Sequence, residues 1–332
     1  MSIVGRNMIK KAALLILCIA VMVGTFSCGE AKETVVIYSS AEDYSIEYLT
    51  QRLNEEFPEY NIIIEYLSTG NHAAKLLAEK TATECDVIHD LEYGYLAQLE
   101  ENQVLADLSS YNYDIYVEDT VESDRYIVEC RNGGAVIVNT DVLAQKGIPE
   151  PTSYQDLLKP EYKNLVSMPN PKSSGTGYMF LKSLVNAWGE EKAFEYFDSL
   201  TPNVLQYTSS GSGPVNALVQ GEVAVGLGMT AQAVIQINEG TPLKVLYFEE
   251  GAPFSLYGQA MVNGKETRES VKRVFDFMIN TYSYENNEKF LPEKIFKDKD
   301  YTLDNYPENI KYSDMKNNTI SEKQRLLEKW EH

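Results

Sequence analysis

The chain has 332 residues, of which 44% are apolar and 23% are charged, a balance typical of globular proteins with a sizeable core. This length is enough for two domains. The formal net charge of −20 argues against a nucleic-acid-binding protein, because most of the surface would repel the phosphates, but not against a small anion held by backbone amides.

The amino terminus predicts export. Three basic residues and no acidic residue precede an almost wholly apolar run that ends at Phe26, which is too short for a comfortable membrane span. The residues around Cys28 resemble a bacterial lipobox, although Thr25 stands where such motifs usually carry Leu. We expect a signal peptide over residues 1–27 and a lipidated Cys28 with a tether over residues 28–33, which would anchor the protein outside the cytoplasm. A soluble secreted protein and an uncleaved anchor are the alternatives.

Cleavage of this signal would leave 26 basic and 49 acidic residues, a net charge of −23. Of the four cysteines, Cys18 then goes with the signal and Cys28 with the lipid. Cys85 and Cys130 could form a disulfide outside the cytoplasm, but neither their spacing nor their context requires one.

From residue 34 the sequence alternates between strand and helix patterns. We expect strands at residues 35–38, 62–67 and 86–89, and helices at residues 46–57, 73–80 and around 96–99. Repeated βα units imply a parallel sheet covered on both faces, with ligands at the carboxyl ends of the strands. The loops after the first and third strands are therefore candidate pocket segments, namely residues 39–42, with Ser39, Ser40 and Glu42, and residues 90–93.

Residues 131–139 read as a strand that begins with paired glycines and would suit a segment crossing between domains. A second αβ series follows, with strands expected at residues 165–168, 204–207, 224–227 and 243–248, and helices at 154–158, 176–188, 190–200, 214–220 and 231–239. A strand at residues 258–262 and a long helix around 271–278 come next, and the polar last fifty residues end in a helix that contains Trp330.

Two strand-to-helix turns share one unusual composition. Ser173, Ser174, Gly175 and Thr176 stand where one helix begins, and residues 208–214 repeat the pattern with Ser210, Ser212 and Gly213. A helix start leaves backbone N–H groups unpaired and carries a partial positive charge, so such turns favour bound anions. Ser and Thr are also ordinary helix caps, and each turn alone could be no more than that.

The order of these pieces resembles the extracellular solute-binding proteins of ABC importers, in the group that includes ferric-ion, organophosphate and thiamine binders. The resemblance covers nearly all of residues 34–280. Its pieces are VVIYSS, EEFPEY, CDVIHD, GGAVIVNTDVL, IPEPTSYQDLLKPEYKNLVSMPNP, SSGTGYMF, VNALVQGEVAVGLG and the EEG turn before YGQAMV.

This resemblance implies an α/β, type II periplasmic-binding-protein-like fold, in which each of two lobes is a sheet covered by helices and the ligand lies in the cleft between them. Lobe 1 would begin at residues 34–138, lobe 2 would span 139–245, and residues 246–332 would return to lobe 1. Closure about two crossing segments, near 131–139 and 245–257, would trap the ligand for delivery to a permease and ATPase complex. The resemblance implies no cofactor, no catalysis and a monomer.

The resemblance also implies roles for single residues. Ser173, Ser174, Gly175 and Thr176 would hold phosphoryl oxygens, as in members that bind sugar phosphates or aminoalkylphosphonates, with help from Ser40 and the turn that contains Ser210. The hydroxyl or amino end of the ligand would meet further residues of the cleft, for which we expect Glu250, Gln232 and Tyr257. Thr230 lies in the same loop as Gln232, and Arg131 could hold an acid or be structural.

Four other classes of protein compete with this interpretation. Ferric binders of the family commonly carry paired tyrosines in the loop that here holds Met229 and Thr230, and trivalent iron prefers several anionic oxygen ligands that this loop does not offer. The acidic charge would suit a polyamine, but that reading leaves the two serine-glycine turns unexplained. An exported enzyme is a weaker alternative, because the chain has no HExxH, CxxC or GxSxG motif. A surface structural protein is also weaker, because it would not need a two-lobed cleft. Residues 226–231 match a dinucleotide fingerprint, but this unit lies too late in the chain to be a first βα turn.

Overall fold

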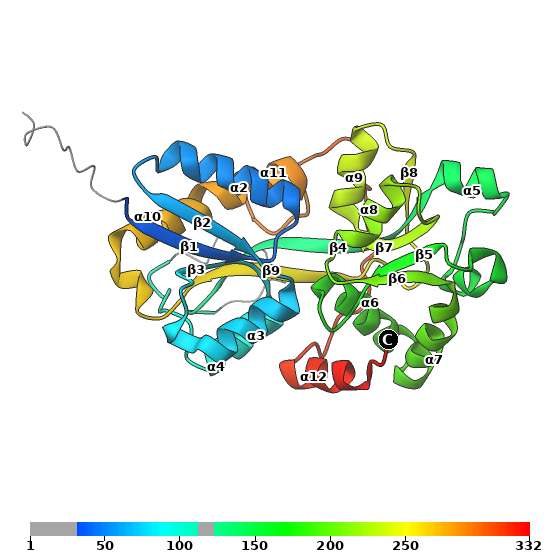
Figure 1. Ribbon diagram of the computed structural model, residues 1–332, viewed down its shortest axis with the longest axis horizontal. Helices are drawn as coiled ribbons and strands as arrows, with labels where there is room; N and C mark the ends of the chain where they lie inside the picture. Colours follow the sequence, from blue (N-terminus) through cyan, green and yellow to red (C-terminus); the bar gives the residue numbers. More distant parts are fainter. Residues whose placement is uncertain (1–31, 112–122) are drawn as a thin grey trace, which may run out of the picture.

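The computed structural model describes residues 32–111 and 123–332, so the predicted signal peptide and Cys28 lie outside the described residues. Over these residues the strands follow the order β2-β1-β3-β9-β4-β7-β5-β6, and β8 pairs with β4. The strands form two lobes, one on each side of the crossing strands β4 and β9 (Figure 1). This two-lobed α/β arrangement confirms the predicted fold.

Lobe 1 is a sheet between two layers of helices (Figure 1). Its parallel strands are β1 (Thr34–Ser39), β2 (Asn61–Tyr66) and β3 (Val87–Glu92). One face carries α2 (Asp43–Glu56), α10 (Glu269–Phe277) and α11 (Ser283–Phe290), and the other carries α3 (Thr69–Glu79) and α4 (Tyr93–Glu101). A π-helical turn, Met278–Tyr282, joins α10 to α11, and short 3₁₀ helices lie at Lys80–Ala82 and Lys265–Thr267.

Lobe 2 repeats this layering. Its strands are β5 (Val166–Pro169), β6 (Val204–Thr208), β7 (Val225–Met229) and β8 (Leu243–Leu246). Helices α8 (Gly213–Val219) and α9 (Thr230–Asn238) cover one face, and α6 (Gly175–Trp188) and α7 (Glu190–Leu200) cover the other (Figure 1). The remaining elements are α5 (Thr140–Lys146) and the 3₁₀ helices Tyr154–Leu158, Pro160–Tyr162 and Thr201–Asn203.

Two antiparallel strands cross between the lobes, β4 (Ile127–Asn139) and β9 (Phe254–Met261). The amino-terminal half of β4 pairs with β9, and its carboxyl-terminal half, from Gly134, pairs with β7 and β8. One continuous strand therefore belongs to both sheets. All thirteen residues of β4 are buried, as expected for a strand covered on both faces along its whole length.

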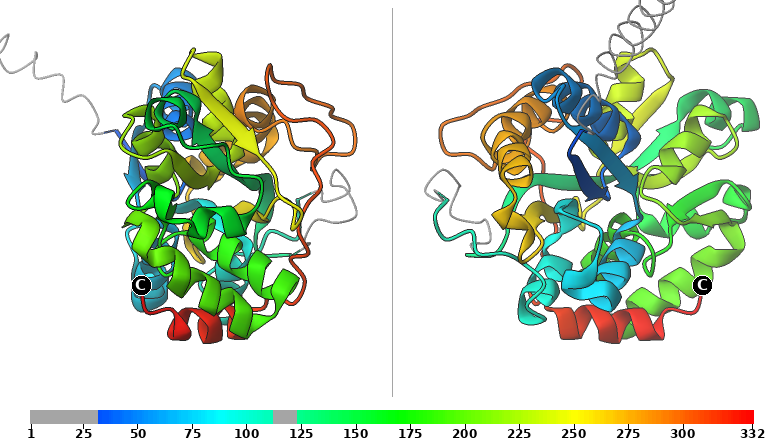
Figure 2. Two further views of the ribbon diagram at one scale, coloured as in Figure 1. Left: turned by 90° about the vertical axis from the view of Figure 1, so that its right-hand side faces the viewer. Right: turned by 60° about the vertical axis from the view of Figure 1, so that its left-hand side comes forward.

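The last helix differs from the prediction. Helix α12 (Ile320–Lys329) was expected with lobe 1, but Leu326 and Trp330 are fully buried in the core of lobe 2, where the Trp330 ring packs against Phe197 at a centroid distance of 5.1 Å. Figures 1 and 2 show α12 lying under both lobes, beside α4 and α7. Its apolar side chains fit lobe 2 because α6 and α7 leave an aromatic surface there to be covered.

The side of α12 that faces lobe 1 carries a buried ion pair. Lys323 pairs with Glu92 at the end of β3, and both side chains are almost fully buried. The Lys323 ammonium also lies 3.8 Å from the ring centroid of Tyr95 in lobe 1 and 4.5 Å from that of Tyr178 in lobe 2. One side chain thus touches both lobes.

Cys85 and Cys130 are both buried free thiols, so the disulfide that the sequence left open is not formed. Over the described part of the chain, no helix combines the length and the apolar character needed to cross a membrane.

Candidate ligand-binding site

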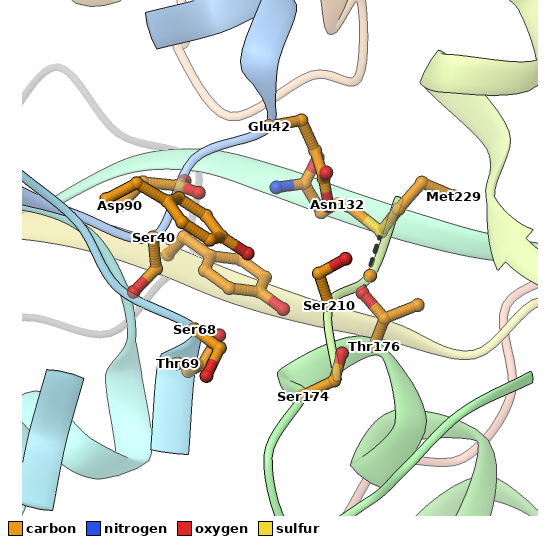
Figure 3. A pocket seen from close by; sticks show the side chains of 13 residues that line it. Ser40, Glu42, Ser68, Thr69, Asp90, Asn132, Ser174, Thr176, Ser210 and Met229 are labelled. Atoms are coloured by element: carbon orange, nitrogen blue, oxygen red, sulfur yellow. Dashed lines mark hydrogen bonds between the residues drawn. The ribbon is translucent and has the colours of Figure 1, made fainter. Parts of the chain in front are cut away.

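A small cavity lies between the two lobes, where β4 and β9 cross (Figure 3). Both lobes and both crossing strands contribute to its wall. The lining residues are Ser40, Glu42, Tyr66, Ser68, Thr69, Asp90, Asn132, Ser174, Thr176, Ser210, Gly211, Met229 and Tyr257.

Two helices begin at this cavity, one from each lobe. Ser68 stands directly before α3, where its hydroxyl makes no capping hydrogen bond, and Ser174 caps the start of α6, where its hydroxyl oxygen accepts a hydrogen bond from Gly177 N at 3.4 Å. Figure 3 shows Ser68 and Thr69 facing Ser174 and Thr176 across the cavity. Because helix starts carry unpaired N–H groups and a partial positive charge, this side of the cavity suits an anionic group.

The hydroxyl groups of the wall are only partly used within the protein. Thr176 Oγ1 donates to Met229 Sδ at 3.2 Å, and Ser210 Oγ lies 3.1 Å from Ser212 Oγ. Ser68 Oγ is buried and has no hydrogen-bond partner within residues 32–111 and 123–332. A buried hydroxyl without a partner is costly, so Ser68 is a natural place for a ligand atom to bind.

Two carboxyl groups lie on the other side of the cavity. In Figure 3 Glu42 and Asp90 lie above the space, and Ser68, Thr69 and Ser174 lie below it. Burial raises the pKa of Glu42 to about 8, opposed by a hydrogen bond from Ser212, and raises the pKa of Asp90 to about 7. The residues that line the cavity include no Lys or Arg to offset these carboxyls. This side therefore suits donors such as hydroxyl or ammonium groups.

The lobes touch each other at the rim of the cavity, as in a closed state. Gly70 N of lobe 1 donates to Ser173 O of lobe 2 at 3.2 Å, and the side chain of Glu42 is hydrogen-bonded to Ser212. Gly211 has no room for a side chain, since a Cβ there would lie 2.5 Å from Thr176 Oγ1 and 2.7 Å from Glu42 Oε1. The glycine in the second turn thus allows the lobes to approach.

The structure brings six of the residues expected from the sequence to the cavity wall. These are Ser40, Glu42, Ser174, Thr176, Ser210 and Tyr257. Three more lie directly behind the wall or at its rim: Ser173 at the contact with Gly70, Ser212 against Glu42, and Gly175, where a Cβ would lie 2.7 Å from Tyr257 Oη. Whether any of them contacts a ligand stays a prediction.

Other expected residues have partners elsewhere. The Arg131 guanidinium lies 5.2 Å from the ring centroid of Phe254 and 5.5 Å from that of Tyr312, and Glu250 accepts a hydrogen bond from Trp188 Nε1 at 3.0 Å. The structure therefore gives these two residues packing roles outside the cavity lining.

Four further expected residues also lie outside the lining. Gln232 donates to Asn216 Oδ1 at 3.0 Å, and Thr230 Oγ1 lies 3.1 Å from Tyr247 Oη. Ser39 is fully buried behind Ser40, and Gly213 packs against Thr208. These positions are close to the site in sequence but not part of its wall.

Sequence reasoning missed several residues of the wall. Tyr66 ends β2, which is adjacent to β1 in the sheet, and Ser68 and Thr69 follow it. The rule that ligands lie at the carboxyl ends of parallel strands could have found them, because it applies to the second strand as well as to the first and third. The same rule applies to Met229, which ends β7, whereas Asn132 had no such signal because it lies within β4 among buried residues.

Comparisons with known proteins agree with this architecture. An uncharacterized protein of Haemophilus influenzae is 30% identical over 260 residues, which cover 76% of this chain and 74% of that protein. The spermidine/putrescine-binding periplasmic protein of Salmonella typhimurium is 30% identical over 151 residues, 44% of this chain and 42% of that protein. The solved structure of the periplasmic binding protein AfuA from Actinobacillus pleuropneumoniae, with exogenous fructose-6-phosphate bound, has a TM-score of 0.80 and 26% identity, covering 90% of this chain and 98% of that one.

A family model described as bacterial extracellular solute-binding protein matches residues 85–323, which is more than half of the chain. This match includes most of lobe 1, all of lobe 2 and the first residues of α12. The chain therefore belongs to the bacterial extracellular solute-binding protein family.

Proposed function

We propose that this protein is the solute-binding component of an ABC importer and that it captures a small solute with a phosphoryl group at one end and hydroxyl or ammonium groups at the other. The observation that carries the proposal is the division of the closed interlobe cavity. Helix starts and hydroxyls lie on one side of it, and two carboxyls lie on the other.

The starts of α3 and α6 support the phosphoryl end. The partial positive charge of these helix starts and the hydroxyls of Ser68, Thr69, Ser174 and Thr176 would complement a phosphoryl group, which only accepts hydrogen bonds. The unpartnered Ser68 Oγ fits such a contact. The AfuA structure, which holds fructose-6-phosphate, is consistent with a ligand of this class.

Glu42, Asp90 and Asn132 would bind the other end of the solute. Carboxyl oxygens accept hydrogen bonds from sugar hydroxyls and attract ammonium groups, so a sugar phosphate and an aminoalkylphosphonate would both complement this side. A solute of this length would touch both lobes. Binding would then stabilise the closed state through contacts that the open state lacks.

A polyamine is the second candidate, favoured by the same two carboxyls and by the absence of Lys and Arg from the lining of the cavity. The Salmonella typhimurium relative is named for spermidine and putrescine. The starts of α3 and α6 count against a cation at that side of the cavity. Ferric iron has less support, since no group of three or more His, Cys, Asp or Glu side chains in the described residues could hold a metal ion.

The protein would act by binding without catalysis. A lipidated Cys28 would hold it on the outer face of a membrane beside its permease, and stable attachment would require the multiply acylated lipoprotein terminus, since one acyl chain binds only weakly. The permease and its ATPase would then receive the solute from the closed form.

Thermal unfolding against a panel of solutes tests the proposal. The panel contains fructose 6-phosphate, glucose 6-phosphate, 2-aminoethylphosphonate, inorganic phosphate, spermidine and ferric citrate. A solute at 100 times its dissociation constant should add about 2.7 kcal/mol to the stability. Stabilisation by spermidine alone, or by no member of the panel, would count against a phosphoryl solute.

Variants then locate the phosphoryl group. Ser174→Ala and Thr176→Ala should each weaken binding of the phosphoryl solute roughly tenfold or more, because each removes a hydrogen bond to a charged group. Ser153→Ala is the matched control. Ser153 also caps a helix, with its hydroxyl oxygen 3.3 Å from Asp156 N, but it does not line the cavity. Equal losses in Ser174→Ala and Ser153→Ala would mean that Ser174 acts only as a cap.

A further inference from the structure

Two buried histidines lie behind the cavity and bind neighbouring serines. His72 Nδ1 is 2.8 Å from Ser40 Oγ, and His89 Nδ1 is 2.8 Å from Ser39 Oγ. Both imidazoles are almost completely buried, but only Ser40 lines the cavity. The two pairs differ at the second ring nitrogen, and that difference decides which atom of each pair carries the proton.

The surroundings of His89 favour a proton on Nε2. His89 Nε2 lies 3.5 Å from a carboxyl oxygen of Glu129, which can accept it. The hydrogen bonds of Ser39 are consistent with this tautomer. Its Oγ accepts a hydrogen bond from Ala41 N at 3.1 Å and can donate its own proton to His89 Nδ1. Every polar atom of this pair is then used.

The surroundings of His72 favour the opposite arrangement. Its Nε2 is buried and has no hydrogen-bond partner in the described residues. A buried N–H without an acceptor is rarer in proteins than a buried acceptor without a donor, so the proton belongs on Nδ1. Burial, with smaller effects of His89 and Lys75, lowers the pKa of His72 to about 3, so the ring stays neutral and has only one N–H to place.

We infer that His72 donates its Nδ1–H to Ser40 Oγ and so fixes the Ser40 hydroxyl as a hydrogen-bond donor into the cavity. A hydroxyl has one proton, and when its oxygen accepts from His72 that proton is free to point at the ligand. His72 is thus a positioning residue that acts through Ser40 without touching the solute.

This inference rests on the proposed function and sharpens its specificity. A donor fixed at Ser40 selects an acceptor, such as a phosphoryl oxygen, and disfavours an ammonium group at that point of the wall. The tautomers of the two histidines therefore help to distinguish a phosphoryl solute from a polyamine.

Nuclear magnetic resonance of the ligand-free protein tests the tautomers without any knowledge of the solute. The chain has only three histidines, so long-range ¹H–¹⁵N spectra of histidine-labelled protein can be assigned with one variant each. We expect His72 with its proton on Nδ1 and His89 with its proton on Nε2, both unchanged between about pH 5.5 and 8. A proton on Nε2 of His72 would overturn the inference.

Binding measurements with the phosphoryl solute test the consequence. Ser40→Ala and His72→Phe should each weaken binding roughly ten- to a hundredfold, and the double variant should lose little more, because both changes remove one donor. His72→Asn, whose amide can supply an N–H near the Nδ1 position, should restore most of the affinity. The control is Ser270→Ala, which removes a buried hydroxyl bonded to Glu33 and away from the cavity lining.

If His72→Phe binds the phosphoryl solute with wild-type affinity while Ser40→Ala binds it more weakly, the role of His72 is refuted. If wild-type protein binds no phosphoryl solute at all, the proposed function fails, and the spectra alone then decide the tautomers. If His72→Phe does not fold, the wild-type spectra and the His72→Asn variant still test the inference.

Discussion

Replacing Gly70 with alanine should weaken the closure of the two lobes without impairing the folding of the protein. Gly70 lies in the first turn of α3, and a Cβ there would lie 2.5 Å from Lys172 O and 3.3 Å from Ser173 Cα in the opposite lobe. These are backbone atoms, which cannot rotate away as a side chain could. Ordinary contact begins near 3.4 Å, so the lobes would have to part by roughly 0.9 Å at this point.

The Gly70→Ala substitution should raise the free energy of the closed state. Overpacking of about 1–3 kcal/mol, with the weakened hydrogen bond from Gly70 N to Ser173 O, should cost about 2–4 kcal/mol, which corresponds to roughly 30- to 1000-fold weaker solute binding. The open protein should fold as well as before, or be more stable by at most about 1 kcal/mol, because alanine suits a helix better than glycine.

Calorimetric titration measures the affinity, and small-angle scattering with solute present measures the compaction. Asn71→Ala is the matched control, because it changes the same helix at an exposed position. Binding of normal affinity by Gly70→Ala, with the same compaction as the wild type, would refute closure through this contact. A loss of affinity that Asn71→Ala shares would mean that the helix, and not the clash, is responsible.

Three other outcomes are expected. The folded-state pKa values of Glu42 and Asp90, about 8 and about 7, lie above their usual values of 4.5 and 3.8, so the folded protein holds more protons and its ligand-free stability should fall as pH rises from about 5 to 8.5. Thermal unfolding midpoints measured across this pH range test the predicted fall in stability. The Glu42→Gln variant should show a smaller fall. Lys323→Met should destabilise the protein by about 3–5 kcal/mol in denaturant titrations, because it leaves Glu92 buried without its cation, and Glu92→Gln in the same chain should recover part of the loss. Cys28→Ala should move the protein from the membrane to the soluble fraction, and continued membrane association would contradict a lipid anchor.

Much of the fold could be predicted from local sequence patterns. The periodicity of Leu49 and Leu53 marked α2, and the β-branched run at residues 35–38 marked the first strand, β1. The composition of the turn at residues 173–176 also located the start of α6, because a helix cap is a property of a few adjacent residues. These signals are local, so they can be read without knowing the tertiary structure.

The positions that the sequence alone could not resolve depend on distant partners. The sequence left Arg131 open between an anion ligand and a structural role, because Phe254 and Tyr312, which lie beside its guanidinium, are far away in the sequence. Tyr312 comes from the polar segment after α11, whose path no periodic pattern predicts. Asn132 could not be found for the same reason, since only the pairing of β4 with β9 brings it to the cavity.

The burial of Trp330 also determines how late in synthesis the core of lobe 2 can be completed. The last strand of lobe 2 ends at Leu246, but the aromatic cluster under that lobe stays open until Trp330 arrives. At roughly 5–20 residues per second, a ribosome needs several seconds to cover that interval. During this time lobe 2 lacks part of its core.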